Sequence, residues 1–350
     1  MAMLPTINFI HAREITSLSR IGILAFGGMG LSLLLVPVYT RLAFTYKLWK
    51  QPRADAITGE KAPIYQKLHA AKHKRNIPTM GAVPFIIAIG IVTVLFNFSR
   101  NQTWLPLFVL VAAGIVGLFD DYLNIRSEGL GIAGMRGKIK FALIFGIAVV
   151  GAVYFYVKLS YSMIHVPAVG DFNIGWLYIP LFIAVVVSTA NAVNITDGMD
   201  GLSGGLLSTA FAVYAVIAYF QNNFGIASFC ATMVGALLVY TWFNIYPARF
   251  FMGDSGAFAF GTTLGVIAML TNTVFVLPII AAVFVVEAGS SVVQIASKKL
   301  FHRKIFLSAP LHHHLEAIGW PETKVTMRLW VIGQVTGALG LILALIGNKV

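Results

Sequence analysis

The sequence has few charged residues and only one cysteine. Of its 350 residues 11% are charged and 58% are hydrophobic, and its mean hydropathy is +0.83. A soluble domain of this length carries roughly a quarter charged residues, so the shortage indicates that lipid is the solvent. The single cysteine, Cys230, excludes an internal disulfide framework. The sequence contains no Gly-x-x-x-x-Gly-Lys-Ser/Thr phosphate loop, so any nucleotide recognition must use another architecture.

Long apolar stretches account for most of the chain. Each is close to the ~20 residues that a helix needs to cross a bilayer. A lone strand in hydrocarbon would leave its backbone groups unpaired, so each stretch is predicted to be helical. The predicted spans are 21–45, 80–98, 104–119, 140–158, 176–193, 202–220, 225–243, 256–271, 274–296 and 326–346. Since no repeat or polar linker divides the sequence, we predict one all-α integral membrane domain over 1–350, with about ten transmembrane helices.

Basic residues are distributed unevenly, although the net charge of +12 alone could suggest a nucleic-acid ligand. Most of the 25 lysines and arginines fall in loops that share one side if the predicted spans alternate. By the positive-inside rule this side is cytoplasmic, and both termini are extracytoplasmic. The predicted cytoplasmic loops are about 46–79, 120–139, 194–201, 244–255 and 297–325. The basic excess therefore indicates membrane topology and an attraction for anionic lipids and substrates, and we expect no nucleic-acid partner.

Aspartates gather at the cytoplasmic ends of the predicted spans. A carboxylate near hydrocarbon is costly, so it normally has a partner or a task. One such aspartate could be a solvated helix end or a cap, but several in three separate segments on one side favour a shared site. The aspartates in question are Asp120, Asp121, Asp197, Asp200 and Asp254.

The spacing of these polar residues restricts their geometry. Asp120 and Asp121 are adjacent, and adjacent residues on a helix point about 100° apart, so the two carboxylates are expected to serve different partners. Polar residues recur every third position over 191–200, at Asn191, Asn194, Asp197 and Asp200, a stripe that drifts around a helix. Gly198 and Gly201 would let the backbone leave the helix there and approach a ligand.

The clusters are rich in oxygen and poor in soft ligands, which suits Mg2+. In proteins this ion keeps several waters and binds one or two carboxylates together with substrate phosphates. Such a metal neutralises the charge on a diphosphate as its bond breaks. Lys74 and either Lys138 or Lys140 could complete the charge balance, or each could be only a topology marker.

Three consecutive histidines, His312, His313 and His314, lie in the last predicted cytoplasmic loop. Neighbouring histidines seldom converge on one tetrahedral zinc, and Mg2+ does not prefer imidazole. We therefore interpret them as hydrogen-bond donors to phosphate or sugar oxygens.

Several motifs resemble those of the polyprenyl-phosphate N-acetylhexosamine-1-phosphate transferase superfamily. They are P-T-M-G at 78–81, the Asp120–Asp121 pair, N-A-V-N-I-T-D-G-M-D-G-L at 191–202, N-I-Y-P-A-R-F-F-M-G-D at 244–254, V-F-V-V-E at 283–287, Gln294, and H-H-H-L-E-A-I-G-W-P-E at 312–322. The last motif is similar to the phospho-N-acetylmuramoyl-pentapeptide-transferase branch rather than the N-acetylglucosamine branch. The resemblance runs from about Lys47 to the last predicted span.

The resemblance implies a reaction and its partners. UDP-N-acetylmuramoyl-pentapeptide and undecaprenyl phosphate would give lipid I and UMP, with Mg2+, at the cytoplasmic side of a bacterial inner membrane. A ten-helix fold in the lipid bilayer, often a homodimer, is implied as well. The superfamily relative that uses UDP-N-acetylglucosamine is the nearest alternative. A cation-coupled transporter is the alternative of another class, but transporters place such acids near the bilayer midplane, whereas these gather at one face.

The resemblance also implies roles for individual residues. Asp254 would be the principal metal ligand, with Asp120 and Asn191 beside it, and Asp120, Asp121, Asp254, Lys140 and His312 would be catalytic. The implied uridine pocket comprises Asp197, Gly198, Met199, Asp200 and Phe251. The residues expected to hold diphosphate, sugar or other substrate groups are Lys74, Thr79, Asn191, Asn194, Asn244, Gln294, His313 and His314.

The predicted chemistry is attack of a polyprenyl phosphate on the nucleotide diphosphate, with UMP as the leaving group. A phosphate monoester is already largely deprotonated at neutral pH, since its second pKa is near 6. Positioning and charge neutralisation should therefore supply most of the rate. Direct attack is favoured, and a two-step route through an aspartyl phosphate on Asp120 or Asp121 remains the alternative.

Overall fold

The computed structural model describes residues 4–49, 76–126 and 134–347. The described part is helical except for one two-stranded hairpin, which confirms the all-α prediction. The helices are α1 (Leu4–Thr45), α3 (Val83–Phe96), α4 (Trp104–Arg126), α5 (Gly137–Val153), α6 (Tyr178–Thr196), α7 (Leu202–Phe220), α8 (Phe224–Asn244), α9 (Gly253–Leu270), α10 (Leu277–Ile280), α11 (Ala282–Phe301), α12 (Leu311–Ala317) and α13 (Glu322–Gly347). The hairpin pairs β1 (Met163–Val166) with β2 (Gly170–Asn173) in antiparallel register. One π-helical turn (Tyr154–Lys158) and one 3-10 turn (Gly175–Leu177) flank it.

Eight helices of the described part are long and apolar enough to cross a membrane, and α3 is a shorter apolar helix. The predicted span over 274–296 contains Pro278, which from the sequence is expected to kink or break the helix, and the structure shows a break. Pro278 lies in the first turn of the short helix α10. The helix is interrupted at Ala281, and α11 begins at Ala282. Proline has no N–H and clashes with the preceding turn, so it is accommodated most easily in the first turn of a helix, although α1 also contains Pro37 within its length. The total number of spans and the orientation of the chain ends stay predictions.

Helix α9 forms the centre of the bundle. It packs mainly against α4 and α6, and 94% of its apolar window is buried. Small residues let these helices approach closely: a methyl group built on Gly117 of α4 would overlap the backbone of Asp254, and one built on Gly261 would lie 2.8 Å from the Cα atom of Ala190. Such contacts are the usual basis of helix packing in lipid, where the hydrophobic effect is weak. The close contact at Gly117 brings the carboxyl end of α4 against the first turn of α9.

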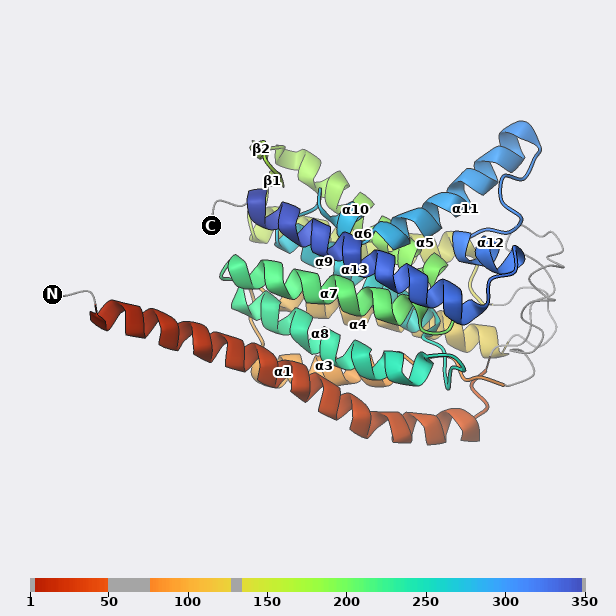
Figure 1. Cartoon of the computed structure of the whole chain (residues 1–350), viewed down its shortest axis with the longest axis horizontal. Helices are drawn as coiled ribbons and strands as arrows, with labels where there is room; N and C mark the ends of the chain where they lie inside the picture. The colour runs from red at the N-terminus through yellow and green to blue at the C-terminus, as the bar shows by residue number, and fades with distance from the viewer. Residues whose placement is uncertain (1–3, 50–75, 127–133, 348–350) are drawn as a thin grey trace.

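Three outer helices present apolar surface to their surroundings. Only 22% of the apolar window of α1 is buried, and the values for α5 and α13 are 28%. Figure 1 shows α1 and α13 running along the outside of the bundle, with α11 extending away from it. The exposed side chains on α1 include Phe26 and Leu34. Water would not solvate such helices, so these faces fit contact with lipid.

The two ends of the bundle differ in character. Figure 1 shows the hairpin and both ends of the described chain at one end, and α12 at the other. Residues of the predicted site lie at the carboxyl end of α4 and at the amino ends of α5 and α9, so α5 and α9 both run away from the site and α4 runs towards it. The arrangement therefore separates the predicted site from the hairpin by the length of the helices.

Candidate active site

Three charged side chains from three helices meet at one end of the bundle. The Nζ atom of Lys140, in the first turn of α5, lies 2.6 Å from Oδ2 of Asp120 and 2.7 Å from Oδ2 of Asp254. Asp120 is fully buried, whereas Lys140 and Asp254 keep part of their surface exposed. The described side chains of this cluster are two carboxylates and one ammonium, so carboxylate oxygens predominate in it. The cluster is therefore suited to attract a further cation.

The Asp121 carboxylate fastens the first turn of α9. Its two oxygens accept the backbone N–H groups of Asp254 at 3.2 Å and Ser255 at 3.1 Å. These N–H groups belong to a helix start, where they have no partner within the helix and where a negative charge is favourable. Gly253 has a φ of +75°, and a methyl group built there would overlap Asp121. Asp120 and Asp121 thus face different partners, as their adjacent helix positions require.

The other oxygen of Asp120 holds the segment that leads into α5. It accepts the backbone N–H of Met135 at 2.6 Å, and the amide of Asn124 donates to Oδ2 at 3.0 Å. Asn124 is buried one helical turn after Asp120, and Gly134 lies directly against it. The sequence interpretation did not include Asn124, although its spacing of four residues from Asp120 was a usable signal.

Of the two asparagines on α6, Asn194 is the one in contact with the carboxylate cluster. Its amide nitrogen lies 3.3 Å from Oδ1 of Asp254. Asn191 is exposed, and its amide donates to the backbone carbonyl of Val187 one turn earlier at 2.7 Å. The drift of the three-residue spacing separates the two side chains. The role of Asn191 as a metal ligand stays a prediction.

The turn after α6 is tied to the 244–250 loop by two buried polar residues. Asp200 accepts the backbone N–H of Ala248 at 3.0 Å. The Asn244 side chain accepts the N–H of Gly201 and donates to the carbonyl of Phe250, both at 2.8 Å. The backbone N–H of Asp200 also donates to Glu322, at 2.8 Å.

These contacts show that Asp200 and Asn244 shape the loops themselves. Binding of substrate by either side chain stays a prediction.

The rest of this turn is partly open. Asp197 is half-buried and accepts a short hydrogen bond from the Ser203 hydroxyl. Gly198 is half-buried as well, and Met199 is buried beneath it. Gly201 directly precedes α7 and has a φ of +79°, a backbone conformation that is strained for a residue with a side chain. The open stretch that could meet a ligand therefore comprises Asp197 and Gly198.

The P-T-M-G segment pairs with the segment before α9. Phe251 donates its N–H to the carbonyl of Pro78 and accepts from Gly81, both at 2.8 Å. The Thr79 hydroxyl is buried and has no hydrogen-bond partner among the described residues. A methyl group built on Gly253 would lie 2.8 Å from this hydroxyl. Thr79 therefore places an unused hydroxyl beside the start of α9.

The three histidines turn to three different partners. The Nδ1 atoms of His312 and His313 lie 2.8 Å from Glu287 and Glu316, respectively. The Nδ1 atom of His314 instead accepts the N–H of a loop residue, at 3.3 Å. Their Nδ1 atoms face different groups, whereas the Nε2 atoms of His312 and His313 both lie near Gly198, and the expectation that the histidines form no zinc site stays a prediction. Glu287 was missed as a partner because only the fold brings it to α12, whereas Glu316 follows His313 by three residues on one helix, a spacing that was a usable signal.

Gln294 holds the loop between α11 and α12. Its side-chain oxygen accepts the N–H groups of Ile305 and Phe306 at 3.0 Å, and its nitrogen donates to the carbonyl of Phe306 at 2.9 Å. The predicted role of Gln294 in substrate binding therefore has no support from its contacts and stays a prediction. Lys74 lies outside the described residues.

The structure distinguishes the two lysines at the start of α5. Lys138 is exposed, whereas Lys140 bridges the two carboxylates. Both lie in the first turn of α5, but two helical positions place them about 200° apart.

The oxygen atoms of this cluster are suited to bind Mg2+. Asp120 and Asp254 each present a carboxylate, and their Oδ2 atoms converge on the cationic Nζ atom of Lys140. Among the residues that the structure describes, no group of three or more His, Cys, Asp and Glu side chains could hold a metal alone. Mg2+ needs only one or two carboxylates when waters and substrate phosphates complete its shell. Asp254 and Asp120 are the residues that would hold it.

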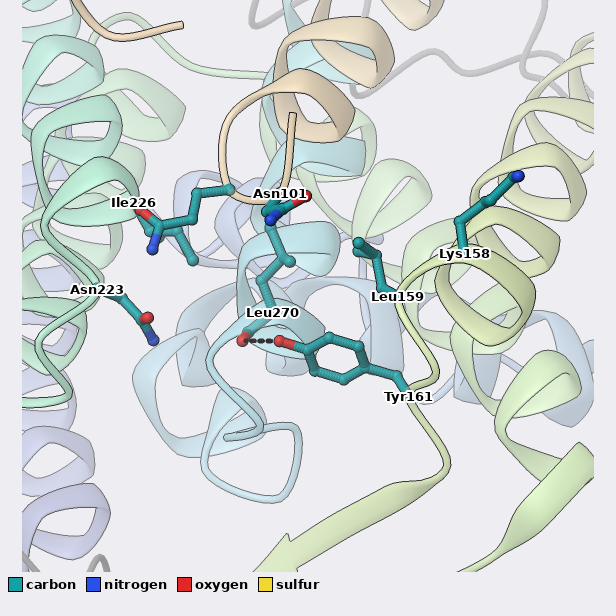
Figure 2. A pocket seen from close by; sticks show the side chains of 8 residues that line it. Asn101, Lys158, Leu159, Tyr161, Asn223, Ile226 and Leu270 are labelled. Atoms are coloured by element: carbon teal, nitrogen blue, oxygen red, sulfur yellow. Dashed lines mark hydrogen bonds between the residues drawn. The ribbon is translucent and has the colours of Figure 1, made fainter. Parts of the chain in front are cut away.

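A cavity of about 360 Å³ lies elsewhere, at the opposite ends of these helices (Figure 2). Its lining includes Lys158, Asn223 and Leu270, which lie after the end of α5, before α8 and at the end of α9. The Tyr161 hydroxyl donates to the carbonyl of Leu270 at 3.4 Å, the bond drawn in Figure 2. Burial raises the pKa of Tyr161 above its usual value. The lining contains no acidic residue, so this cavity does not contribute to the carboxylate chemistry.

Sequence comparisons find proteins that are similar to this chain over most of its length. A family model described as glycosyl transferase family 4 matches residues 103–272, which include both carboxylate helices. A protein of Chloroflexus aurantiacus is 36% identical, over 97% of this chain and 93% of its own length. A protein of Latilactobacillus sakei is 38% identical over 79% of this chain and 87% of its own length. A protein of Geobacillus thermodenitrificans is 34% identical over 89% of this chain and 92% of its own length. All three relatives are named phospho-N-acetylmuramoyl-pentapeptide-transferase.

Proposed function

The chain belongs to the phospho-N-acetylmuramoyl-pentapeptide-transferase family, and we propose that its carboxylate cluster transfers phospho-N-acetylmuramoyl-pentapeptide from the UDP-linked sugar to undecaprenyl phosphate. The products are lipid I and UMP, so the chain is a membrane transferase of peptidoglycan synthesis. The relatives favour neither the N-acetylglucosamine-1-phosphate transferase nor the transporter alternative.

The observation that carries the proposal is the cluster of Asp120, Lys140 and Asp254. These side chains come from three separate segments at one end of a membrane bundle. The Nζ atom of Lys140 lies 2.6 Å from Asp120 and 2.7 Å from Asp254. The Thr79 hydroxyl, which has no hydrogen-bond partner among the described residues, lies beside the start of α9, the helix that carries Asp254. A site that transfers a phosphoryl group needs positioning and charge neutralisation more than a covalent group.

Bond changes at this site follow from the reactants. An oxygen of the polyprenyl phosphate forms a bond to the sugar-linked phosphorus, and the bond from that phosphorus to the bridging oxygen breaks. UMP leaves with the bridging oxygen. Mg2+, when bound, supplies neutralisation of the charge that develops on the leaving phosphate. Asp254 and Asp120 would hold this ion, and Lys140 would neutralise a second phosphate oxygen once substrate separates it from the carboxylates.

Asp121 is suited to position Asp254 rather than to react. Both of its oxygens already accept N–H groups of α9. Asp120, with Lys140 on one oxygen, is then the carboxylate closer to the reacting phosphates. Direct attack by the polyprenyl phosphate needs no phosphorylated aspartate. Recovery of a phospho-aspartate after incubation with the nucleotide substrate alone would favour the two-step route instead.

Orientation and assembly belong to the same proposal. The site faces the cytoplasm of a bacterial plasma membrane, because the loops near it are rich in lysine and arginine. The protein forms a homodimer, as the family resemblance implies. The mass of the purified protein in detergent tests the dimer.

One assay tests the substrate assignment. Purified protein in detergent receives undecaprenyl phosphate and either UDP-N-acetylmuramoyl-pentapeptide or UDP-N-acetylglucosamine, with Mg2+ supplied or chelated. We expect UMP release only from the muramoyl nucleotide and only with Mg2+. Equal release from UDP-N-acetylglucosamine would reassign the substrate, and undiminished release without divalent metal would remove Mg2+ from the proposal.

A further inference from the structure

A buried carboxylate–imidazole pair joins α11 and α12. The Oε2 atom of Glu287 lies 2.8 Å from Nδ1 of His312 and also accepts the backbone N–H of His312 at 3.2 Å. Both side chains have an exposed fraction of 0%. An ionised carboxylate oxygen only accepts, so Nδ1 carries the proton. One glutamate oxygen thus fixes both the backbone and the ring of His312.

The other ring nitrogen of His312 is unused. Nε2 is buried and has no hydrogen-bond partner among the described residues. It faces Gly198, where a built methyl group would overlap it, and Nε2 of His313 lies 3.4 Å from the same built position. Leaving a buried polar atom unpaired costs free energy, so such an atom in a native protein calls for an explanation. Its position against the open part of the Asp197–Gly198 turn points to a ligand.

We infer that Glu287 is a positioning residue, which holds the His312 ring so that Nε2 forms a hydrogen bond with a polar group of the bound nucleotide sugar. This inference rests on the proposed function. Glu287 itself, buried behind the ring, does not touch the substrate. A carboxylate behind a ligating histidine has the same effect at metal sites, where it fixes the tautomer and the orientation of the ring.

The absence of a side chain at Gly198 supports this geometry. A glycine there lets the ring approach the backbone of the turn. The φ of Gly198 is outside the left-handed region, so backbone conformation does not require glycine at this position. The edge of the His312 ring that carries Nε2 occupies part of the space that a side chain at Gly198 would take.

A double-mutant cycle tests the inference in the purified full-length chain. The variants are Glu287→Met, His312→Ala and the double variant, each assayed for kcat and KM of polyprenyl-phosphate-dependent UMP release. Methionine keeps the volume of glutamate but offers no carboxylate, and an apolar residue in place of a buried charge is often tolerated in folding. We expect each single variant to lose about 10- to 100-fold in kcat/KM, as outer-shell partners of histidine do.

The double variant decides between positioning and a structural role. If Glu287 acts through His312, Glu287→Met causes no further loss in the His312→Ala background, because the two residues work as a unit. Glu287→Gln, which keeps an acceptor oxygen, should recover part of the loss. Losses that multiply in the double variant, or a wild-type kcat/KM in Glu287→Met, would overturn the inference.

A matched control comes from the opposite end of the molecule. His165 and Asp171 form the same contact in the hairpin, with 2.7 Å between Nδ1 and Oδ1. Asp171→Asn removes a carboxylate–imidazole pair without approaching the site, and kcat/KM should stay unchanged. The activity of the unmodified protein distinguishes a failure of the proposed function from a failure of the role of Glu287. If it releases no UMP at all, the proposed function fails, whereas an active protein with multiplying losses refutes only the role of Glu287.

Discussion

The Nζ atom of Lys140 lies 2.7 Å from a carboxylate oxygen of Asp254, although 114 positions separate the two residues in the chain. The contact depends on three helices: α4 supplies Asp120, α5 supplies the lysine, and α9 begins with the second aspartate. The glycine contact at Gly117 lets α4 and α9 approach closely enough for it. The packing of these helices therefore brings Asp120, Lys140 and Asp254 together.

Replacing Lys140 with methionine should lower kcat for UMP release by about 10²- to 10³-fold, the usual cost of removing one group that stabilises developing charge. The matched control is Lys138→Met, because Lys138 lies in the same helical turn but is exposed. Steady-state kinetics of both variants provide the comparison. Equal losses in the two variants would contradict the role assigned to Lys140.

Replacing Asp121 with alanine should destabilise the start of α9. The variant leaves two N–H groups at a helix terminus without the acceptor that they have now. Loss of a helix cap costs about 1–2 kcal/mol in the free energy of unfolding. Thermal unfolding in detergent measures the effect, with Lys138→Met as the reference that should not shift. An unchanged melting temperature for Asp121→Ala would show that the carboxylate does not stabilise α9.

Adding a methyl group at Gly198 should raise the KM for the nucleotide sugar. Alanine there would overlap Nε2 of His312 and displace the ring, while the backbone conformation suits any residue. Gly146→Ala is the control, since a methyl group at that helical position meets no atom within 4 Å. Substrate titration of both variants checks the expectation. A wild-type KM for Gly198→Ala would mean that the ring can move away without loss.

Introduced cysteines can establish the orientation of the bundle. Cys230, the sole native cysteine, is fully buried, so background labelling is expected to be low. In intact cells a membrane-impermeant thiol reagent should label Val169→Cys in the hairpin, where the native side chain is 70% exposed. It should label Lys138→Cys only in inside-out vesicles. The opposite pattern would place the carboxylate cluster on the extracytoplasmic face and contradict the positive-inside prediction.

The all-α fold followed from hydropathy, because lipid forces every backbone group to be satisfied within a helix. The break near Pro278 was harder to locate, since proline predicts either a kink or a new helix start. Side-chain partners between distant segments could not be predicted. Glu287 has no local pattern that connects it to His312, and the contact exists only because α11 and α12 pack together.

A spacing of four residues on one helix predicts side-chain contacts better than a spacing of three repeated over several steps. Asn124 follows Asp120 by four residues and hydrogen-bonds to it, yet the sequence alone did not single it out. On α6, the three-residue spacing of polar side chains was expected to drift around the helix, and Asn194, but not Asn191, contacts Asp254. Residue spacing alone left Lys138 and Lys140 open, and the family resemblance favoured Lys140. The fold leaves Lys138 exposed and brings Lys140 to the carboxylates.

The most direct test measures UMP release by the wild-type protein and by Asp254→Ala, each with and without undecaprenyl phosphate, in the presence of Mg2+. The carboxylate cluster predicts release by the wild type only when the lipid phosphate is present, and no detectable release by Asp254→Ala under either condition. Near-normal turnover by Asp254→Ala would show that the chemistry takes place elsewhere in the molecule.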